Sequence, residues 1–174
     1  SARFLEAQMW DAGRQVLRRR YRDGDAAIDG YAEDYAYAVF GLMELFQTGG
    51  DPHWLAWARA LQKRQDEQFW DAENGGWFNT TGIDPSVILR MKEDYDGAEP
   101  APSSISVLNL LMMAHLTGEA ELFERIDKTL KMFGPRIGQV ARAVPMMMAA
   151  LSTYHARVTQ VVVVGPQDDA GTHD

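Results

Sequence analysis

Two acidic segments of this sequence carry the residue types that carbohydrate chemistry uses. The first, "DGYAEDY", covers residues 29–35, and the second, "EDYDGAE", covers residues 93–99. One carboxyl group of such a set can protonate a leaving oxygen, while a second activates water or stabilises a cation-like centre. The catalytic residues predicted on this basis are Asp34, Asp94, Asp96 and Glu99, and the predicted substrate-binding residues are Tyr35, Tyr95, Glu93 and Trp77.

The same carboxylates also have a purely structural interpretation. Aspartates that precede a helix accept hydrogen bonds from free backbone N–H groups and interact favourably with the helix dipole, each contributing about 0.3–2 kcal/mol. Asp29 and Asp96 precede glycine, which is typical of turns. The two interpretations differ in one observable: whether Asp34 and Asp96 point into a shared cavity or towards helix N–H groups.

The elements that must position these side chains are predicted to be helices. Residues 31–47 and 103–116 are apolar on nearly all sides, which predicts helices buried around most of their circumference. Residues 52–70 and 117–134 are amphipathic, and each follows one of the buried helices. A further apolar helix is expected to begin near Pro145, because proline is costly inside a helix.

Segments rich in turn-forming residues separate the helices. Residues 11–30 predict a short hairpin or an extended loop. The Asn74-Gly75-Gly76 sequence is a hairpin signal, and residues 87–92 are a candidate short strand. These inserts are expected to be small beside the helices.

An internal repeat organises the chain. Residues 29–55 resemble residues 96–123: each copy reads Asp-Gly, buried helix, Thr-Gly turn and amphipathic helix. Alternating buried and amphipathic helices suit a toroid, in which inner helices contact other helices on most sides and outer helices face water. The loops that lead into the inner helices then line one open end of the central cavity, so both acidic segments are expected there.

The composition excludes several classes of function. The net charge of −8 and the sequence pI of about 5.0 argue against nucleic acid and anionic membranes as partners. The chain has no cysteine, which excludes disulfides, thiolate metal sites and cysteine catalysis. No apolar run approaches the roughly 18 residues of a membrane span. Histidine spacing matches no metal site. We therefore expect a cytoplasmic protein with no metal and no cofactor.

Four motifs carry a resemblance to a known family: "AIDGYAEDYAYAVFGLMELF", "WDAENGGWF", "LRMKEDYDGAEPAPSSISVLNLL" and "VVVVG". Across almost its whole length the chain resembles the C-terminal part of the thioredoxin-domain proteins related to spermatogenesis-associated protein 20. The resemblance implies an (α/α)6 toroid similar to N-acylglucosamine 2-epimerases and six-hairpin glycosidases, which a thioredoxin-like domain precedes in the family. Family members usually read Ser-Gly-Asn-Ser where this sequence has Ala101-Pro102-Ser103-Ser104. That departure favours a helix beginning at Pro102, with Ser103 or Ser104 as its cap.

The expected fold class is therefore all-α, with αα-hairpin repeats forming a partial (α/α)6 toroid with short β-hairpin inserts. The toroid is expected over residues 1–158, followed by a strand-like segment and a disordered tail at residues 159–174. Epimerases of the resembling fold use histidines as acid and base, but none of the four histidines lies in an acidic segment, so that mechanism is not supported.

The predicted function follows from the acidic segments and the incomplete ring. We expect a fragment of a carbohydrate-active protein, epimerase-like or glycosidase-like, that binds a small-molecule sugar and is inactive alone. The alternative is a non-catalytic protein-interaction or scaffold module. Because an incomplete ring exposes apolar helix flanks, a homodimer is expected in either case.

Overall fold

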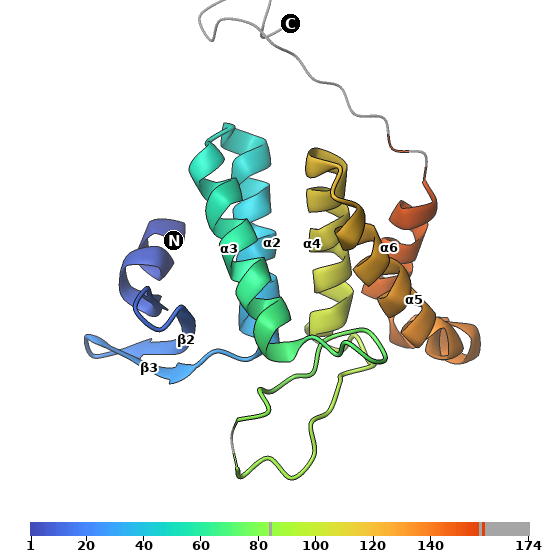
Figure 1. Ribbon diagram of the computed structural model, residues 1–174, viewed down its shortest axis with the longest axis horizontal. Helices are drawn as coiled ribbons and strands as arrows, with labels where there is room; N and C mark the ends of the chain where they lie inside the picture. Colours follow the sequence, from blue (N-terminus) through green and yellow to red (C-terminus); the bar gives the residue numbers. More distant parts are fainter. Residues whose placement is uncertain (84, 157, 159–174) are drawn as a thin grey trace, which may run out of the picture.

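The computed structural model describes residues 1–83, 85–156 and 158, and most of these residues are helical (Figure 1). The predicted strand-like segment and tail at residues 159–174 lie outside the described residues. In chain order the elements are α1 (Ala2–Phe4), the π-helical turn η1 (Leu5–Met9), β1 (Trp10–Asp11), β2 (Val16–Arg22), β3 (Asp25–Asp29), α2 (Ala32–Gly49), α3 (Pro52–Phe69), α4 (Pro102–Thr117), α5 (Ala120–Val140), the 3-10 turn η2 (Ala141–Ala143) and α6 (Pro145–His155).

The long helices form two layers. Helix α4 lies between α2 and α6 and packs against both, while α3 packs on α2 and α5 packs on α4. Most of α4 is buried, whereas α3 and α5 each bury one face. The predicted helices are therefore confirmed in the part of the chain that the structure describes, and so is the burial of α4. The predicted burial of α2 around most of its circumference is not confirmed, because α2 buries six residues, as many as α3.

Local sequence signals explain where the helices begin and end. Asp51 Oδ1 accepts a hydrogen bond from His53 N at 2.9 Å, and Pro52 opens α3, as the sequence predicted. Gly50 and Gly118 end α2 and α4 in the left-handed conformation, with φ of 67° and 72°. A glycine at this position adopts positive φ without steric cost.

A buried polar network fixes α2, α3 and α4 against one another. Gln65 Nε2 of α3 donates to Ala32 O of α2 and to Ser106 Oγ of α4, both at 2.9 Å. Asn109 Nδ2 of α4 donates to Ala36 O of α2 at 2.9 Å. Because buried polar groups are costly when unpaired, these contacts favour one relative position of the three helices.

A three-stranded antiparallel sheet, in the order β1-β2-β3, precedes α2. Its register pairs Trp10 with Leu17 and Arg20 with Ala27. Leu17 attaches the sheet to the helices, since its N–H donates to Tyr35 Oη at 2.9 Å and its carbonyl accepts from Gly30 N at 2.7 Å. The predicted hairpin at residues 11–30 is confirmed.

Three local predictions were wrong. Helix α5 was expected to end at Gly134-Pro135, but it continues to Val140. The apolar face that contains Phe133 goes on to Ile137, and its burial outweighs the hydrogen bond that the proline removes. Residues 87–92 form no strand, and the turn at Asn74-Gly75-Gly76 closes a single bridge between Trp70 and Trp77 rather than a full hairpin.

Candidate functional site

The first acidic segment begins α2 and is used largely for capping. Asp34 Oδ2 accepts from Tyr31 N at 2.8 Å, which completes a capping box at the start of the helix. Arg19 of β2 pairs with Glu33 at 2.5 Å and with Asp34 at 3.1 Å. Burial raises the pKa of Asp34 above its ordinary value, and the Tyr31 N–H and Arg19 oppose that shift. Asp34 therefore points back at its own helix.

Asp96, in the second acidic segment, connects two helix starts. Its Oδ1 accepts from Ala101 N at 2.8 Å, directly before α4. Its Oδ2 accepts from Met146 N at 2.8 Å and from Met147 N at 3.3 Å, in the first turn of α6. The side chain is buried, so these bonds to backbone N–H groups replace the water that the carboxylate loses.

The neighbouring serines do not cap α4 as expected. Helix α4 begins at Pro102, as predicted, but its N-cap residue Ala101 provides no side-chain cap. Ser103 Oγ instead accepts from Trp77 N at 3.0 Å. The role expected of Ser103 or Ser104 at the start of α4 is filled by Asp96.

The other carboxylates of the second segment are exposed. Asp94 lies beside Arg136 of α5, with Oδ2 at 3.4 Å from Nε. The carboxylate of Glu99 has no hydrogen bond or ion pair within residues 1–83, 85–156 and 158. Glu93 is held through its backbone, since its N–H donates to Asn79 Oδ1 at 3.1 Å.

Asn79 brings the two acidic segments together. Its carbonyl accepts from Ala32 N, the first residue of α2, at 3.1 Å, while its side chain holds Glu93. Burial, followed by the negative charges of Glu33 and Asp96, raises the pKa of Glu93. The acidic segments of the two repeats therefore lie together where α2 and α4 begin, and the charge of one segment affects the pKa of a carboxyl group in the other.

Tyr37 is a site residue that sequence reasoning missed. Its hydroxyl donates to Pro100 O at 3.0 Å, which joins α2 to the segment before α4. Burial, followed by the charges of Glu99 and Asp96, raises the pKa of Tyr37 to about 12. A signal was present, because Tyr37 lies four residues after Glu33 and therefore on the same face of α2.

A cavity of about 430 Å³ lies beside this end of α2. Its volume lies within the range of small-molecule sites. Its polar groups come from Glu33, Asp34, Tyr37 and Glu99 and from the two arginines Arg18 and Arg19. The complete lining is Leu5, Met9, Leu17, Arg18, Arg19, Glu33, Asp34, Tyr37, Ala38 and Glu99.

Of the three aromatic residues predicted to bind substrate, one is exposed and two are buried. Tyr95 is 53% exposed and lies within the acidic segment. Tyr35 and Trp77 are fully buried: Tyr35 Oη accepts from Leu17 N, and Trp77 Nε1 donates to Asp66 at 2.8 Å. The expectation that these two rings contact a substrate does not fit their positions, because both are covered on all sides by protein.

The arrangement offers the parts of acid–base chemistry. Glu93, with its raised pKa, holds a proton to a higher pH than an ordinary glutamate does. Glu99 and Glu33 supply carboxylates at the cavity and Tyr37 supplies a hydroxyl group, whereas Tyr95 is exposed outside the cavity lining. Asp34 and Asp96 are positioning residues, since their oxygens accept from backbone N–H groups.

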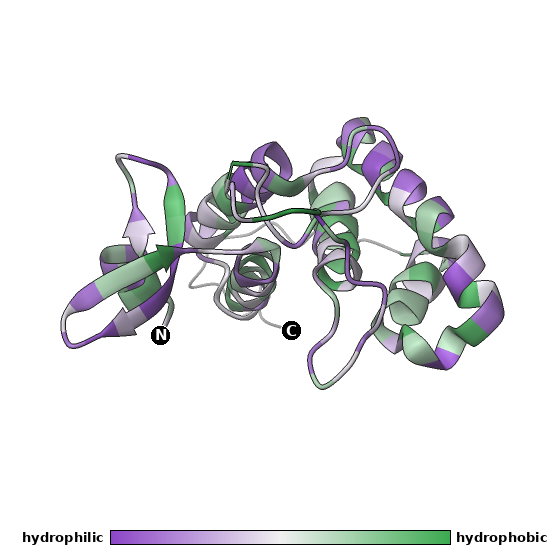
Figure 2. Ribbon diagram, turned by 90° about the horizontal axis from the view of Figure 1, so that it is seen from below, coloured by the Kyte–Doolittle hydropathy of each residue, from purple (hydrophilic) through white to green (hydrophobic). Residues whose placement is uncertain are grey.

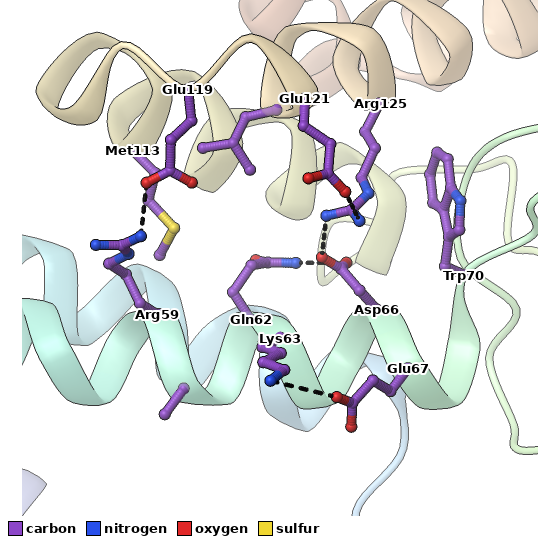
Figure 3. Close-up of a pocket in the computed structure, with 12 residues that line it drawn as sticks. Arg59, Gln62, Lys63, Asp66, Glu67, Trp70, Met113, Glu119, Glu121 and Arg125 are labelled. Atoms are coloured by element: carbon purple, nitrogen blue, oxygen red, sulfur yellow. Dashed lines mark hydrogen bonds and ion pairs between the residues drawn. The ribbon is translucent and has the colours of Figure 1, made fainter.

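A second cavity, of about 580 Å³, lies between α3 and α5 (Figure 3). Ion pairs cross it at both ends: Arg59 contacts Glu119 at 2.5 Å, and Arg125 contacts Asp66 at 2.9 Å. Asp66 also accepts from Gln62 Nε2 at 2.9 Å. The other charged lining residues pair within one helix, Lys63 with Glu67 in α3 and Glu121 with Arg125 in α5. Because its charged groups already have partners, we assign this cavity to the packing of α3 against α5.

The described residues contain neither a metal-binding cluster nor a membrane-spanning helix. Among the described residues, no three His, Cys, Asp or Glu side chains are grouped closely enough to hold a metal ion. The helices in the same part of the chain include none that is long and apolar enough to cross a membrane.

Comparison with known proteins gives relatives but no matching family model. Human spermatogenesis-associated protein 20 is 34% identical over 180 residues, covering 98% of this chain and 23% of that protein. The chain is a relative of spermatogenesis-associated protein 20. The rat protein of that name is 35% identical over 173 residues, covering 94% of this chain and 22% of its own length. An uncharacterised protein of Caenorhabditis elegans is 34% identical over 142 residues, covering 82% of this chain and 19% of that protein.

The relation covers only part of these proteins. The match to spermatogenesis-associated protein 20 lies in its C-terminal part, and the chain spans less than a quarter of the length of the curated relatives named above. The family relation expected from the four motifs is confirmed at this level.

The role of Asp96 is tested by removing its hydrogen bonds. Asp96→Ala is expected to lower the free energy of unfolding by about 3 kcal/mol, because it leaves three N–H groups at two helix starts without their acceptor. Asp96→Asn is expected to be intermediate, and Glu99→Gln to change stability by less than about 0.5 kcal/mol. Urea unfolding followed by circular dichroism measures all three. A loss for Asp96→Ala as small as that for Glu99→Gln would contradict the capping role.

The pH dependence of stability tests the environment of Asp66. Burial raises its pKa from 3.8 to about 6, although Arg125, Trp77 and Gln62 oppose the shift. Because the raised value favours protonation in the folded state, the associated stability is complete below about pH 4 and is lost as pH rises through about 6. Between pH 4 and 7 the wild type is expected to lose about 2–3 kcal/mol relative to Asp66→Asn. Parallel stability curves for the two proteins would show that Asp66 titrates normally.

Proposed function

We propose that the chain forms part of a helical toroid whose acidic end binds and transforms a carbohydrate. The observation that carries this proposal is the meeting of the two acidic segments. Glu33 and Tyr37 of α2 line one cavity with Glu99 from the segment before α4, and Glu93 lies in the field of Glu33. Enzymes that act on glycosides use pairs of carboxyl groups whose environments give them different pKa values.

The helical row supports the toroid part of the proposal. Helices α2, α4 and α6 would be inner helices, and α3 and α5 would be outer helices that pack behind the first two. Only Met147 and Ala150 of α6 are buried, which fits a helix that packs against a further neighbour in a complete ring. The chain spans 23% of the human relative, so a longer polypeptide of this kind has ample sequence for the remaining hairpins.

The proposed division of chemistry follows from the contacts of each carboxylate. Glu93 acts as the proton donor, because burial and the charges of Glu33 and Asp96 raise its pKa above the ordinary glutamate value. Glu99 acts as the base, since its carboxylate faces the cavity without a partner among the described residues. Tyr37 and Tyr95 contact substrate hydroxyl groups. The chain alone is expected to bind sugar weakly and to lack turnover, because only part of the cavity wall is present.

A second candidate function is favoured by a different observation. Several large apolar side chains between α3 and α4 are exposed, including Ile88 and Leu89. Exposed apolar groups of this size favour an interaction or scaffold module. Self-association into a homodimer through the flanks of α2 and α6 remains our proposal for the chain on its own.

The carbohydrate proposal is tested by ligand-observed NMR with a panel of N-acetylglucosamine, N-acetylmannosamine and glucose. At least one sugar is expected to bind with a millimolar Kd, and Glu99→Gln is expected to weaken that binding at least about tenfold, or about 1.4 kcal/mol. Glu124→Gln is the matched control, because Glu124 is exposed on α5 away from the cavity lining. The proposal fails if the folded wild type binds none of these sugars, or if Glu99→Gln binds as tightly as Glu124→Gln.

A further inference from the structure

The segment between α3 and α4 exposes a group of large apolar side chains. Ile88 is 100% exposed, Leu89 is 73% exposed and Met91 is 64% exposed. This segment extends below the helices in Figure 1, and in Figure 2, seen from below, part of it appears as a strongly hydrophobic stretch across the ends of the helices. Single exposed apolar residues are ordinary, but neighbouring ones mark an interaction surface.

Arg90 fastens the segment to the body of the protein. Its guanidinium carbon lies 4.2 Å from the centre of the Phe78 ring. Its Nε donates to Thr80 O at 3.0 Å, and one of its terminal nitrogens donates to Gln68 O at 3.1 Å. The apolar side chains therefore project from a base that several directed contacts hold in place.

Lys92 provides a second fastening on the same side. Its Nζ lies 2.6 Å from both Asp71 Oδ2 and Gly75 O, and 4.8 Å from the centre of the Phe78 ring. The lysine neutralises Asp71, whose pKa is lowered by this contact and by hydrogen bonds from Asn74 and Glu73, against the effect of burial. Both cations of residues 88–95 thus face inward and are already paired.

Most side chains of residues 88–95 are exposed, including Ile88 and Asp94, and the stretch pairs with no strand among the described residues. Leu89, Met91 and Glu93 are exposed, while Arg90 and Lys92 turn to the base. The outer face of residues 88–95 therefore presents apolar groups followed by negative charge, with no free positive charge among the described residues.

A hollow of about 390 Å³ lies within this surface. Its volume exceeds that of one large apolar side chain, and its walls include Phe78, Val87, Ile88, Leu89 and Arg90. In the hot spots of protein interfaces, a large side chain of one partner fills a pocket of the other and is surrounded by weaker contacts.

The acidic side chains begin close to the hollow. Glu93 follows Leu89 by four residues, which is roughly 13 Å along an extended chain. Asp94 is 64% exposed at its side chain, and its ion pair with Arg136 spans 3.4 Å near the surface. Such a pair contributes little and is readily exchanged for another.

We propose that residues 78–83 and 85–95 form a docking surface for a protein segment that inserts an apolar side chain into the hollow and pairs Lys or Arg side chains with Glu93 and Asp94. The charge complementarity decides between the available occupants. A membrane would have to accept two carboxylates beside the inserted apolar groups, and anionic lipids would repel them. A basic, apolar protein segment satisfies both halves of the surface at once. This inference shares Glu93 with the carbohydrate proposal but rests on the apolar loop, so the Ile88→Ser/Leu89→Ser variant, which leaves Glu93 in place, tests it separately.

The test is a selection of random twelve-residue peptides displayed on phage and panned against the full chain. Enriched peptides are expected to combine an aromatic or aliphatic residue with nearby Lys or Arg. Synthetic copies, measured by fluorescence anisotropy, are expected to bind the double variant Ile88→Ser/Leu89→Ser at least tenfold more weakly. Glu93→Gln/Asp94→Asn is expected to weaken binding and to reduce its dependence on salt.

The matched control is Leu45→Ser, which removes an exposed apolar side chain from α2, outside the docking surface, and is expected to leave peptide binding unchanged. Because Ile88 and Leu89 are exposed, urea unfolding of their variant should match the wild type. Failure to enrich peptides, enrichment of acidic ones, or equal binding by the Ile88→Ser/Leu89→Ser variant would overturn the proposal. So would loop-dependent binding to phosphatidylcholine vesicles, or loop-dependent dimerisation in place of peptide binding.

Discussion

The hydrogen bonds of Asp96 are the constraint on which this end of the structure depends. One buried carboxylate accepts from Ala101 N before α4 and from Met146 N and Met147 N in α6. A buried anion is unfavourable unless hydrogen bonds and positive potential compensate it. Here the starts of two helices provide both, so the charge is stable only when α4 and α6 begin side by side. The carbonyl of Pro100, which accepts a hydrogen bond from Tyr37, immediately precedes Ala101. The hydrogen bonds of Asp96 therefore also help to position Tyr37 and the cavity that it lines.

The carboxylates at this end of the structure fall into two groups, those with a structural role and those available for binding. Asp34 and Asp96 are occupied by backbone N–H groups. Glu93 and Glu99 remain near Tyr37, as does Glu33, which pairs with Arg19, and these negative charges contribute to the raised pKa values of Glu93 and Tyr37. Such an accumulation of like charge costs stability, and a costly arrangement in a cleft is a reason to infer function. The apolar loop beside it is costly in the same sense, because it leaves Ile88 and Leu89 in water.

The sequence predicted the helices, the burial of α4 and the position of the acidic segments beside the starts of α2 and α4, because periodicity and capping residues are local signals. It could not decide where individual side chains point. Tyr35 and Tyr37 look equivalent in the sequence, yet they lie two residues apart on a helix and face opposite ways: one holds the sheet and the other reaches Pro100. Asp66 looks like a solvated residue of an amphipathic helix, but its partners Trp77 and Arg125 are distant in the chain and become visible only in the fold.

The central claim is that the acidic segments of the two repeats meet and share one electrostatic field. A carboxyl-carbon NMR titration of Glu93, in the wild type and in Glu33→Gln, tests it most directly. The account predicts a pKa above the ordinary glutamate value in the wild type and a lower pKa in Glu33→Gln. The reason is that the charge of Glu33 makes the largest contribution to the raised pKa after burial. An ordinary pKa in the wild type, or the same pKa in both proteins, would contradict it.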